Sequence, residues 1–315
     1  MDEIFLDKNE NPFDIPENIK YEFMEYVKKG NMNRYPEKGL PGLLEKIGDF
    51  TGFNRNNIIA GNGSDELLNM LIERAHGNIV INSPTFEMYR FYANNYGYKT
   101  VDIPLKEDFS LNVEEIKKNG DAGLIVICSP NNPTGNLINK NDIQSVLDMG
   151  IPTILDNAYY EFSGEDYTGL LADYQNLIIL RTFSKAFSMA GLRVGYGIAN
   201  EKFIDTLKKT QAPFYLNILS AKLAEIMIDN YNVVEERVRY IINERERVYH
   251  AIKEISEDSR ANFLFLNRDI YDYMEHKNIH IRKLPQLNGH SRITIGTQEE
   301  NNIAIKAIKS YIENL

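Results

Sequence analysis

The segment from Arg181 to Arg193, RTFSKAFSMAGLR, contains side chains that could perform covalent chemistry. Lys185 follows the apolar run NLIIL (176–180), and burial at the end of such a run lowers the pKa of a lysine because desolvation disfavours its charged form. The neutral amine is then available as a nucleophile. The alternative is a lysine whose stem packs while its amine reaches water. Lys185 alone does not decide between the two.

A second group of residues could bind a phosphate. Gly61, Gly63, Ser64 and Asp65 stand where a strand would turn into the helix DELLNMLIERA (65–75). Free N–H groups and the helix dipole at such a junction attract anions. The same residues also fit a tight turn in which Ser64 or Asp65 caps the helix. Because neither the P-loop G-K-[ST] nor a complete G-x-G-x-x-G is present, a nucleotide is the weaker candidate ligand.

Asp156 ends another apolar run, where a lone carboxylate is costly unless a cation or donor meets it. A turn or helix cap is the simpler explanation, but the pyridinium of pyridoxal phosphate pairs with such an aspartate, and the same cofactor forms a Schiff base with a lysine. Other residues could contact the same cofactor: Asn132 and Tyr159 the ring hydroxyl, Ser184 and Arg193 the phosphate, and Phe86 the ring face. Each of them could instead be a turn, core or helix-end residue, but a single cofactor site explains them all.

These residues need a scaffold that brings distant segments together. Between about residues 57 and 200, apolar runs alternate with amphipathic segments, which predicts a mostly parallel sheet with helices on both faces. The runs occupy 78–84, 100–105, 123–130, 152–160, 176–180 and 194–200. Ligands of open α/β sheets bind beyond the carboxyl ends of the strands, and most of the unusual polar residues lie at such ends.

After Asn200 the pattern changes. A long amphipathic, highly charged segment (231–255) gives way to short strand-like runs at 262–266 and 291–296 and a terminal helix. This predicts a smaller α+β domain, in which the charge run is a solvated helix face.

Composition limits the class of protein. The 315 residues suggest about two domains, and a net charge of −10 argues against nucleic acid or an anionic membrane as the main partner. No apolar run approaches the ~20 residues of a membrane span, and the acidic N-terminus does not resemble a signal peptide. The single cysteine, Cys128, excludes an intrachain disulfide and fits a reducing compartment. We therefore expect a cytoplasmic protein.

Motifs along nearly the whole chain resemble one family. They are LDKNENP (6–12), NRYPEKG (33–39), GNGSDE (61–66), SPTFEMY (83–89), CSPNNPTG (128–135), LDNAYYEF (155–162), RTFSKAFSMAGLRVGY (181–196) and RITIGT (292–297). The chain resembles class I/II pyridoxal-phosphate-dependent aminotransferases of fold type I, and within them the enzymes that act on L-histidinol phosphate. The resemblance implies an α/β fold, with a large cofactor-binding domain at 36–205 and a small domain formed by 1–35 and 206–315.

The resemblance also implies roles for individual residues. Lys185 would be the Schiff-base lysine, and Tyr35 would reach the cofactor phosphate of a partner subunit in a homodimer. Arg282, Arg292 and Asn11 would bind the substrate. The other cofactor contacts would come from Ser64, Asp65, Phe86, Asn132, Asp156, Tyr159, Ser184 and Arg193. The implied reaction transfers an amino group from L-histidinol phosphate to a 2-oxo acid, most simply 2-oxoglutarate.

Several features leave alternatives open. Asn157 replaces a usual acidic residue, Phe86 replaces a more usual tyrosine, and the chain is short for the family. An aromatic amino-acid aminotransferase and a threonine-phosphate decarboxylase share most of the motifs, while a non-enzymatic cofactor-binding regulator is disfavoured because no DNA-binding extension is visible. His276 and His280 lie four residues apart without the H-E-x-x-H arrangement, so we expect no metal site.

Overall fold

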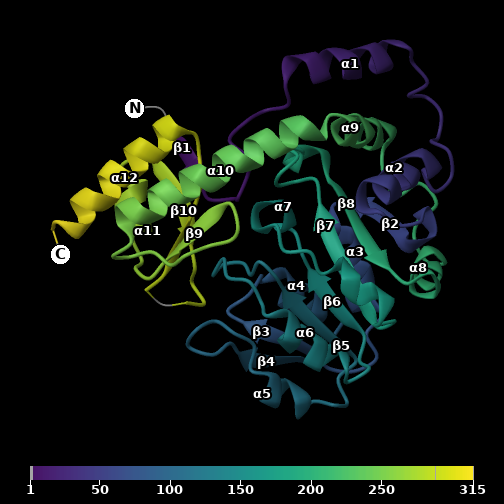
Figure 1. Ribbon diagram of the computed structural model, residues 1–315, viewed down its shortest axis with the longest axis horizontal. Helices are drawn as coiled ribbons and strands as arrows, with labels where there is room; N and C mark the ends of the chain where they lie inside the picture. The colour runs from purple at the N-terminus through teal and green to yellow at the C-terminus, as the bar shows by residue number, and fades with distance from the viewer. Residues whose placement is uncertain (1–2, 288, 315) are drawn as a thin grey trace.

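The computed structural model describes residues 3–287 and 289–314 and contains two β-sheets (Figure 1). The larger sheet has seven strands, and β8 runs in the opposite direction to the other six. Six strands therefore end at one edge, where β8 begins. In spatial order the strands are β2 (Ile58–Asn62), β8 (Val194–Ala199), β7 (Leu177–Thr182), β6 (Thr153–Asp156), β5 (Leu124–Cys128), β3 (Ile79–Ser83) and β4 (Thr100–Pro104).

Helices cover both faces of this sheet, which explains why a central strand such as β5, LIVIC, is apolar and buried along its whole length. In β5, Leu124, Val126 and Cys128 join one hydrophobic cluster, while Ile125 and Ile127 join the other. The first cluster includes side chains from α3 (Ser64–Glu73), α4 (Met88–Asn95) and α8 (Glu201–Lys208). The second includes side chains from α2 (Pro41–Thr51), α5 (Val113–Lys117), α6 (Lys140–Leu147) and α7 (Tyr160–Ser163).

The smaller sheet joins the two ends of the chain. Its strand order is β1 (Ile4–Leu6), β10 (Ile279–Lys283), β11 (Ser291–Thr294) and β9 (Phe263–Leu266). β1 pairs with β10 in parallel, and the other pairs are antiparallel. The N-terminal segment is thereby fixed to the small sheet before it continues past the large one (Figure 1).

Long helices connect the two sheets. α10 (Tyr231–Ile252) packs against α9 (Ile218–Asp229) and α7 on one side and against β9 and α12 (Gln298–Ile312) on the other. α1 (Glu17–Lys28) lies over α9, at the top right of Figure 1. The remaining elements are α11 (Tyr271–Glu275) and the 3₁₀ helices η1 (Arg55–Asn57), η2 (Thr168–Ala172) and η3 (Ala190–Leu192). Among the described residues, no helix has the length and apolar character needed to cross a membrane.

Candidate active site

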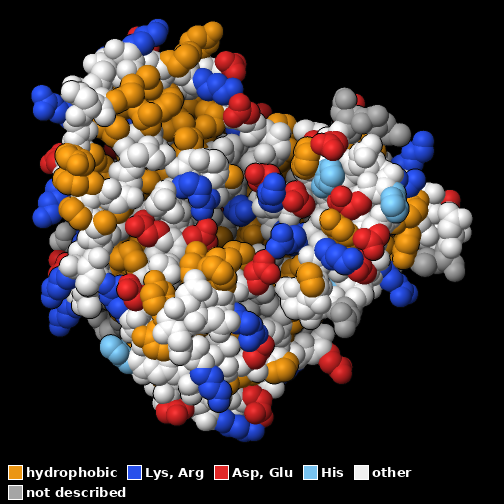
Figure 2. Space-filling model, turned by 180° about the vertical axis from the view of Figure 1, so that it is seen from behind, with side chains coloured by type: hydrophobic (Ala, Val, Ile, Leu, Met, Phe, Trp, Pro, Cys, Tyr) orange, Lys and Arg blue, Asp and Glu red, His pale blue; other side chains and the backbone are white. Residues whose placement is uncertain are grey.

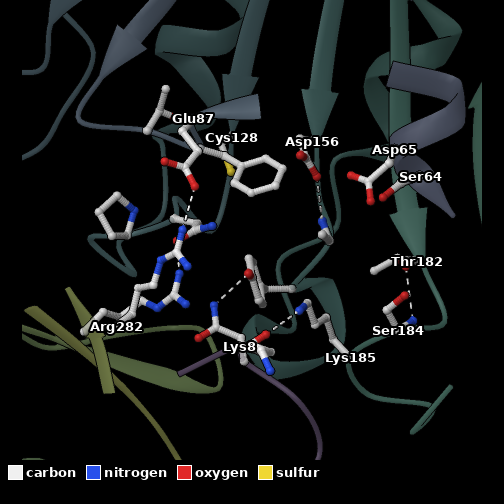
Figure 3. Close-up of a pocket in the computed structure, with 18 of the residues that line it drawn as sticks. Lys8, Ser64, Asp65, Glu87, Cys128, Asp156, Thr182, Ser184, Lys185 and Arg282 are labelled. Carbon is white, nitrogen blue, oxygen red and sulfur yellow. Dashed lines mark hydrogen bonds and ion pairs between the residues drawn. The ribbon is translucent and has the colours of Figure 1, made fainter. Parts of the chain in front are cut away.

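A pocket of about 280 Å³ lies at the carboxyl edge of the large sheet, between it and the small sheet (Figure 3). Polar residues that follow β2, β5, β6 and β7 line one side. Residues of β10, β11 and the segment after β1 line the other. The parallel order of the strands is what gathers side chains from such distant parts of the chain.

Lys185 lies in the loop that follows β7 and reaches back toward the N-terminal segment. Its Nζ donates a hydrogen bond of 3.0 Å to the backbone carbonyl of Lys8 (Figure 3). Burial lowers the pKa of the Lys185 amine to about 8, and the positive charge of Arg292 acts in the same direction. The neutral, nucleophilic form of the amine is therefore far more populated near neutral pH than in an ordinary lysine, and it predominates above about pH 8.

Asp156 is buried at the end of β6. Its Oδ2 accepts a hydrogen bond of 2.7 Å from the hydroxyl of Tyr89, and its Oδ1 accepts one of 3.2 Å from the backbone N–H of Ala158. Burial raises the pKa of Asp156 to about 6, although the bond from Tyr89 opposes this shift. A cationic N–H group in the pocket would offset the cost of the buried charge.

The N-terminus of α3 and the start of β8 form a place for an anion. Arg193 donates to Ser184 Oγ at 3.2 Å and to Asp65 Oδ2 at 2.8 Å, so Asp65 orients the guanidinium. Glycine is required on both sides of this contact: a Cβ at Gly63 would lie 2.6 Å from Arg193 Nη2, and one at Gly195 would lie 2.1 Å from the backbone nitrogen of Ser64. Ser64, Ser184 and Arg193 line the same pocket at the N-terminus of α3, where free N–H groups attract an anion.

Three further predicted residues line the same pocket. Tyr159 accepts a hydrogen bond of 2.9 Å from Asn9 Nδ2, so its own proton is available for a ligand. Asn132 accepts one of 2.5 Å from Arg292 Nη1. Phe86 meets the ring of Tyr89 edge-on at a centroid distance of 5.6 Å. These groups could flank a planar ligand.

The two predicted substrate arginines face each other on adjacent strands, Arg282 on β10 and Arg292 on β11. Arg292 is only 7% exposed, so it is not a surface residue. Its Nη2 donates to the carbonyl of Asp7 at 2.6 Å, while its Nε is buried with no protein partner. Burial lowers the pKa of Arg292 to about 10. Arg282 instead is half exposed and forms an ion pair with Glu87.

Two predicted residues lie outside this pocket. Asn11 donates from Nδ2 to the carbonyls of Lys185 and Ala186 at 3.3 and 3.0 Å. It therefore stabilises the backbone of the loop that carries Lys185, which we call the lysine loop, without lining the pocket. Tyr35 is 81% exposed and stacks on Phe214 at a centroid distance of 4.5 Å. Asn11 therefore touches the backbone of a pocket residue, and Tyr35 does not line the pocket within this one chain.

Sequence reasoning missed several lining or supporting residues. Tyr89, which donates a hydrogen bond to Asp156, lies within the motif SPTFEMY, three residues after Phe86 and in the first turn of α4. The polar segment Asp7–Asn9 also lines the pocket and lies in LDKNENP. Its run of polar residues directly after an apolar run could have indicated a position at the site. Nothing in the sequence around Glu87 distinguished it from an ordinary surface glutamate.

The described residues contain no group of three or more His, Cys, Asp or Glu side chains that could hold a metal ion. His280 stacks on Phe5 and contacts Glu275 through Nδ1 at 3.0 Å. Cys128 lines the pocket, but burial raises the pKa of its thiol well above the usual range, so it is a poor nucleophile.

Comparison with known proteins gives one consistent match. Residues 2–308 match the family model for aminotransferase class I and II. The chain is 48% identical to the histidinol-phosphate aminotransferase of Pyrococcus furiosus over 98% of this chain and 93% of that protein. It superimposes on the histidinol-phosphate aminotransferase of Clostridium acetobutylicum with a TM-score of 0.92, at 27% identity, over 99% and 100% of the two chains. The fold also matches the Sinorhizobium meliloti histidinol-phosphate aminotransferase in complex with pyridoxal 5′-phosphate, with a TM-score of 0.88 at 21% identity over 98% and 91%.

Proposed function

The chain belongs to the class I and II aminotransferases, and from this premise we propose that it transfers the amino group of L-histidinol phosphate to 2-oxoglutarate with pyridoxal 5′-phosphate as its cofactor. One observation carries the proposal. A lysine, a buried carboxylate and an anion-binding helix N-terminus converge on one pocket whose opposite wall holds two arginines. The products would be imidazole-acetol phosphate and L-glutamate.

The buried groups fit this cofactor. Asp156 lacks a cationic partner among its hydrogen bonds, and a protonated pyridine nitrogen would supply one. Ser64, Ser184 and Arg193 would hold the phosphate, Asn132 and Tyr159 the ring hydroxyl, and Phe86 the ring face, with Asp65 fixing Arg193. The bound cofactor supplies a carbonyl carbon and an electron sink.

The protein's own contribution is to bind, orient and move a proton. Lys185 Nζ would take the proton that leaves the substrate Cα, a task suited to an amine with a pKa of about 8. The carbonyl of Lys8 fixes Nζ, and Asn11 fixes the backbone of the lysine loop. Arg292, which lines the pocket, would bind an anionic end of the substrate.

The two arginines support a substrate with an anionic group. Arginine matches both phosphate and carboxylate through paired hydrogen bonds, so the same pair could bind the phosphate of L-histidinol phosphate and a carboxylate of 2-oxoglutarate. An aromatic amino-acid aminotransferase binds donors with uncharged side chains, so a second arginine would have no anionic side chain of the donor to bind. A threonine-phosphate decarboxylase would use it, but would release carbon dioxide without consuming a 2-oxo acid.

A panel of amino donors with 2-oxoglutarate tests the substrate. We expect L-histidinol phosphate to have the highest kcat/KM, and Arg292→Ala to lower kcat/KM of both half-reactions by at least roughly tenfold, since a lost charged hydrogen bond costs about 1.5–3 kcal/mol. Arg239→Ala, at an exposed position on α10, is the matched control. Efficient use of phenylalanine or tyrosine with negligible turnover of L-histidinol phosphate would contradict the substrate assignment.

We also propose a homodimer in which Tyr35 completes the partner's site. Large apolar side chains are exposed around one end of the molecule, on α1 and in the segments before α2 and α9: Tyr21, Met24, Met32, Tyr35 and Phe214. Figure 2 shows apolar surface gathered at the upper left, where this end lies in that view. An apolar patch of this kind marks an interaction surface. In the proposed division into 36–205 and 1–35 with 206–315, all five of these residues belong to the second part.

Subunit mixing tests this arrangement. Lys185→Ala and Tyr35→Ala chains should each be inactive, but random exchange of equal amounts should restore about a quarter of the sites, because half of the dimers would be mixed and each would hold one intact site. Activity is measured before and after mixing under conditions that allow exchange. Each variant mixed with itself is the control. A fully active monomer would rule out the shared site.

A further inference from the structure

An ion pair connects the two walls of the pocket on its exposed side. Glu87 directly precedes α4, which follows β3 of the large sheet, and Arg282 belongs to β10 of the small sheet. Glu87 Oε1 and Arg282 Nη2 are 2.6 Å apart, and both residues line the pocket (Figure 3). The two side chains are 53% and 47% exposed, so the pair is hydrated and can be broken at little cost.

Glu87 also lies close to the second arginine. Arg292 is opposite Arg282 in the register of β10 and β11, and the negative charge of Glu87 acts on the Arg292 guanidinium as well. Arg292 is already bound to Asn132 and to the carbonyl of Asp7. Glu87 therefore places an exposed carboxylate beside the guanidinium group of Arg282, where a substrate anion would have to bind.

A substrate anion and Glu87 compete for the same guanidinium. A ligand that must break an existing ion pair gains only the difference between the new contact and the old one. A phosphate dianion is also repelled by a carboxylate that stays nearby. An uncharged side chain would leave the pair intact and feel neither effect.

We propose that Glu87 is a specificity-determining residue that occupies Arg282 when no anionic substrate is bound and gives way when a phosphate or carboxylate enters. The inference rests on the proposed function in taking Arg282 as a ligand of the substrate's anionic end. Glu87 thereby weakens the binding of both anionic substrates and of their anionic products. The two half-reactions use the same arginines in turn, so the product of the first must leave before the substrate of the second can bind. Weaker product binding speeds this replacement.

Inorganic phosphate is the probe that tests this competition. The protein is loaded with pyridoxal phosphate, so that the cofactor's own phosphate site is filled, and phosphate binding is followed by calorimetry or by changes in cofactor absorbance. We expect Glu87→Gln to lower the Kd of phosphate about three- to fivefold at low ionic strength, and the gain to shrink at high salt. Glu114→Gln, on α5 outside the pocket, makes the same change in net charge and should leave the Kd unchanged.

A second arginine variant separates competition from a general field effect. Arg282→Gln should bind phosphate more weakly than the wild type, and adding Glu87→Gln to it should restore little. A Kd that is unchanged or higher in Glu87→Gln would overturn the inference, as would an equal gain in Glu114→Gln. If the donor panel instead identifies an uncharged donor, the proposed substrate fails, while the phosphate titration still decides whether Glu87 competes for Arg282.

Discussion

Lys185→Ala is expected to abolish transamination, with a fall in kcat of at least about a thousandfold. The variant loses both the nucleophilic amine that joins the cofactor and the general base at the substrate Cα, and general base catalysis alone contributes about 10²–10⁴-fold. Stopped-flow measurement of both half-reactions with purified protein gives the rates. Wild-type protein reconstituted with pyridoxal phosphate should show a visible absorbance band that borohydride abolishes, and Lys185→Ala should bind the cofactor without that band.

The same residue gives a pH dependence. Only the neutral amine reacts with a carbonyl, and burial lowers the pKa of Lys185 to about 8. The rate at which the cofactor-free protein forms the visible band should therefore rise as the pH increases through about 8 and level off above it. An ordinary exposed lysine would keep rising toward pH 10. Lys8→Ala is a useful comparison, because it keeps the backbone carbonyl that Lys185 contacts. A wild-type protein without a visible band would refute the cofactor proposal itself.

Much of the cofactor side of the site could be predicted from sequence because strand ends are local signals. Asp156, Ser184 and Lys185 each follow an apolar run, and parallel order places such ends at one edge. The alternation of apolar runs and amphipathic segments predicted this order, and the family match and structural comparison confirm the α/β fold. β8 runs in the opposite direction, so its beginning lies at the edge where the other strands end. Arg193 directly precedes β8 and therefore lies at that same edge.

The other wall of the pocket depends on pairings that no local pattern reveals. β1 has three residues and acquires its place only by pairing with β10, more than 270 residues later in the chain. That pairing brings Asp7 to Arg292 and Lys8 to Lys185. β10, with the sequence IHIRK, alternates apolar and polar residues too briefly to stand out from a loop. The side chain of Asn11 hydrogen-bonds to the lysine loop, and its contact with the substrate stays a prediction.

Asp156→Asn should lower kcat about 10²–10³-fold and change KM little. An uncharged amide cannot hold the ring nitrogen protonated, and an interaction that stabilises charge mainly in the transition state affects kcat far more than substrate binding. Single-turnover rates with L-histidinol phosphate measure the chemical step directly. Asp173→Asn, at an exposed position after η2, is the matched control. Tyr89→Phe should cause a smaller loss, because it removes one hydrogen bond to Asp156 and leaves the charge.

Cofactor retention provides a second measurement of Asp156. Burial raises the pKa of its carboxyl to about 6 in the protein alone, and a cationic ring nitrogen favours the ionised form. The ion pair is therefore fully present above that pH, and it is lost as the pH falls and the carboxylate becomes protonated. The Kd of pyridoxal phosphate should rise on acidification in the wild type, with the midpoint below about 6 when the cofactor is bound. Asp156→Asn should show a smaller rise below pH 6, because the amide does not titrate and only the protonation of other groups, such as Lys185, then weakens cofactor binding. Near-normal kcat in Asp156→Asn, together with an unchanged acid dependence of cofactor binding, would mean that the ring nitrogen has another partner.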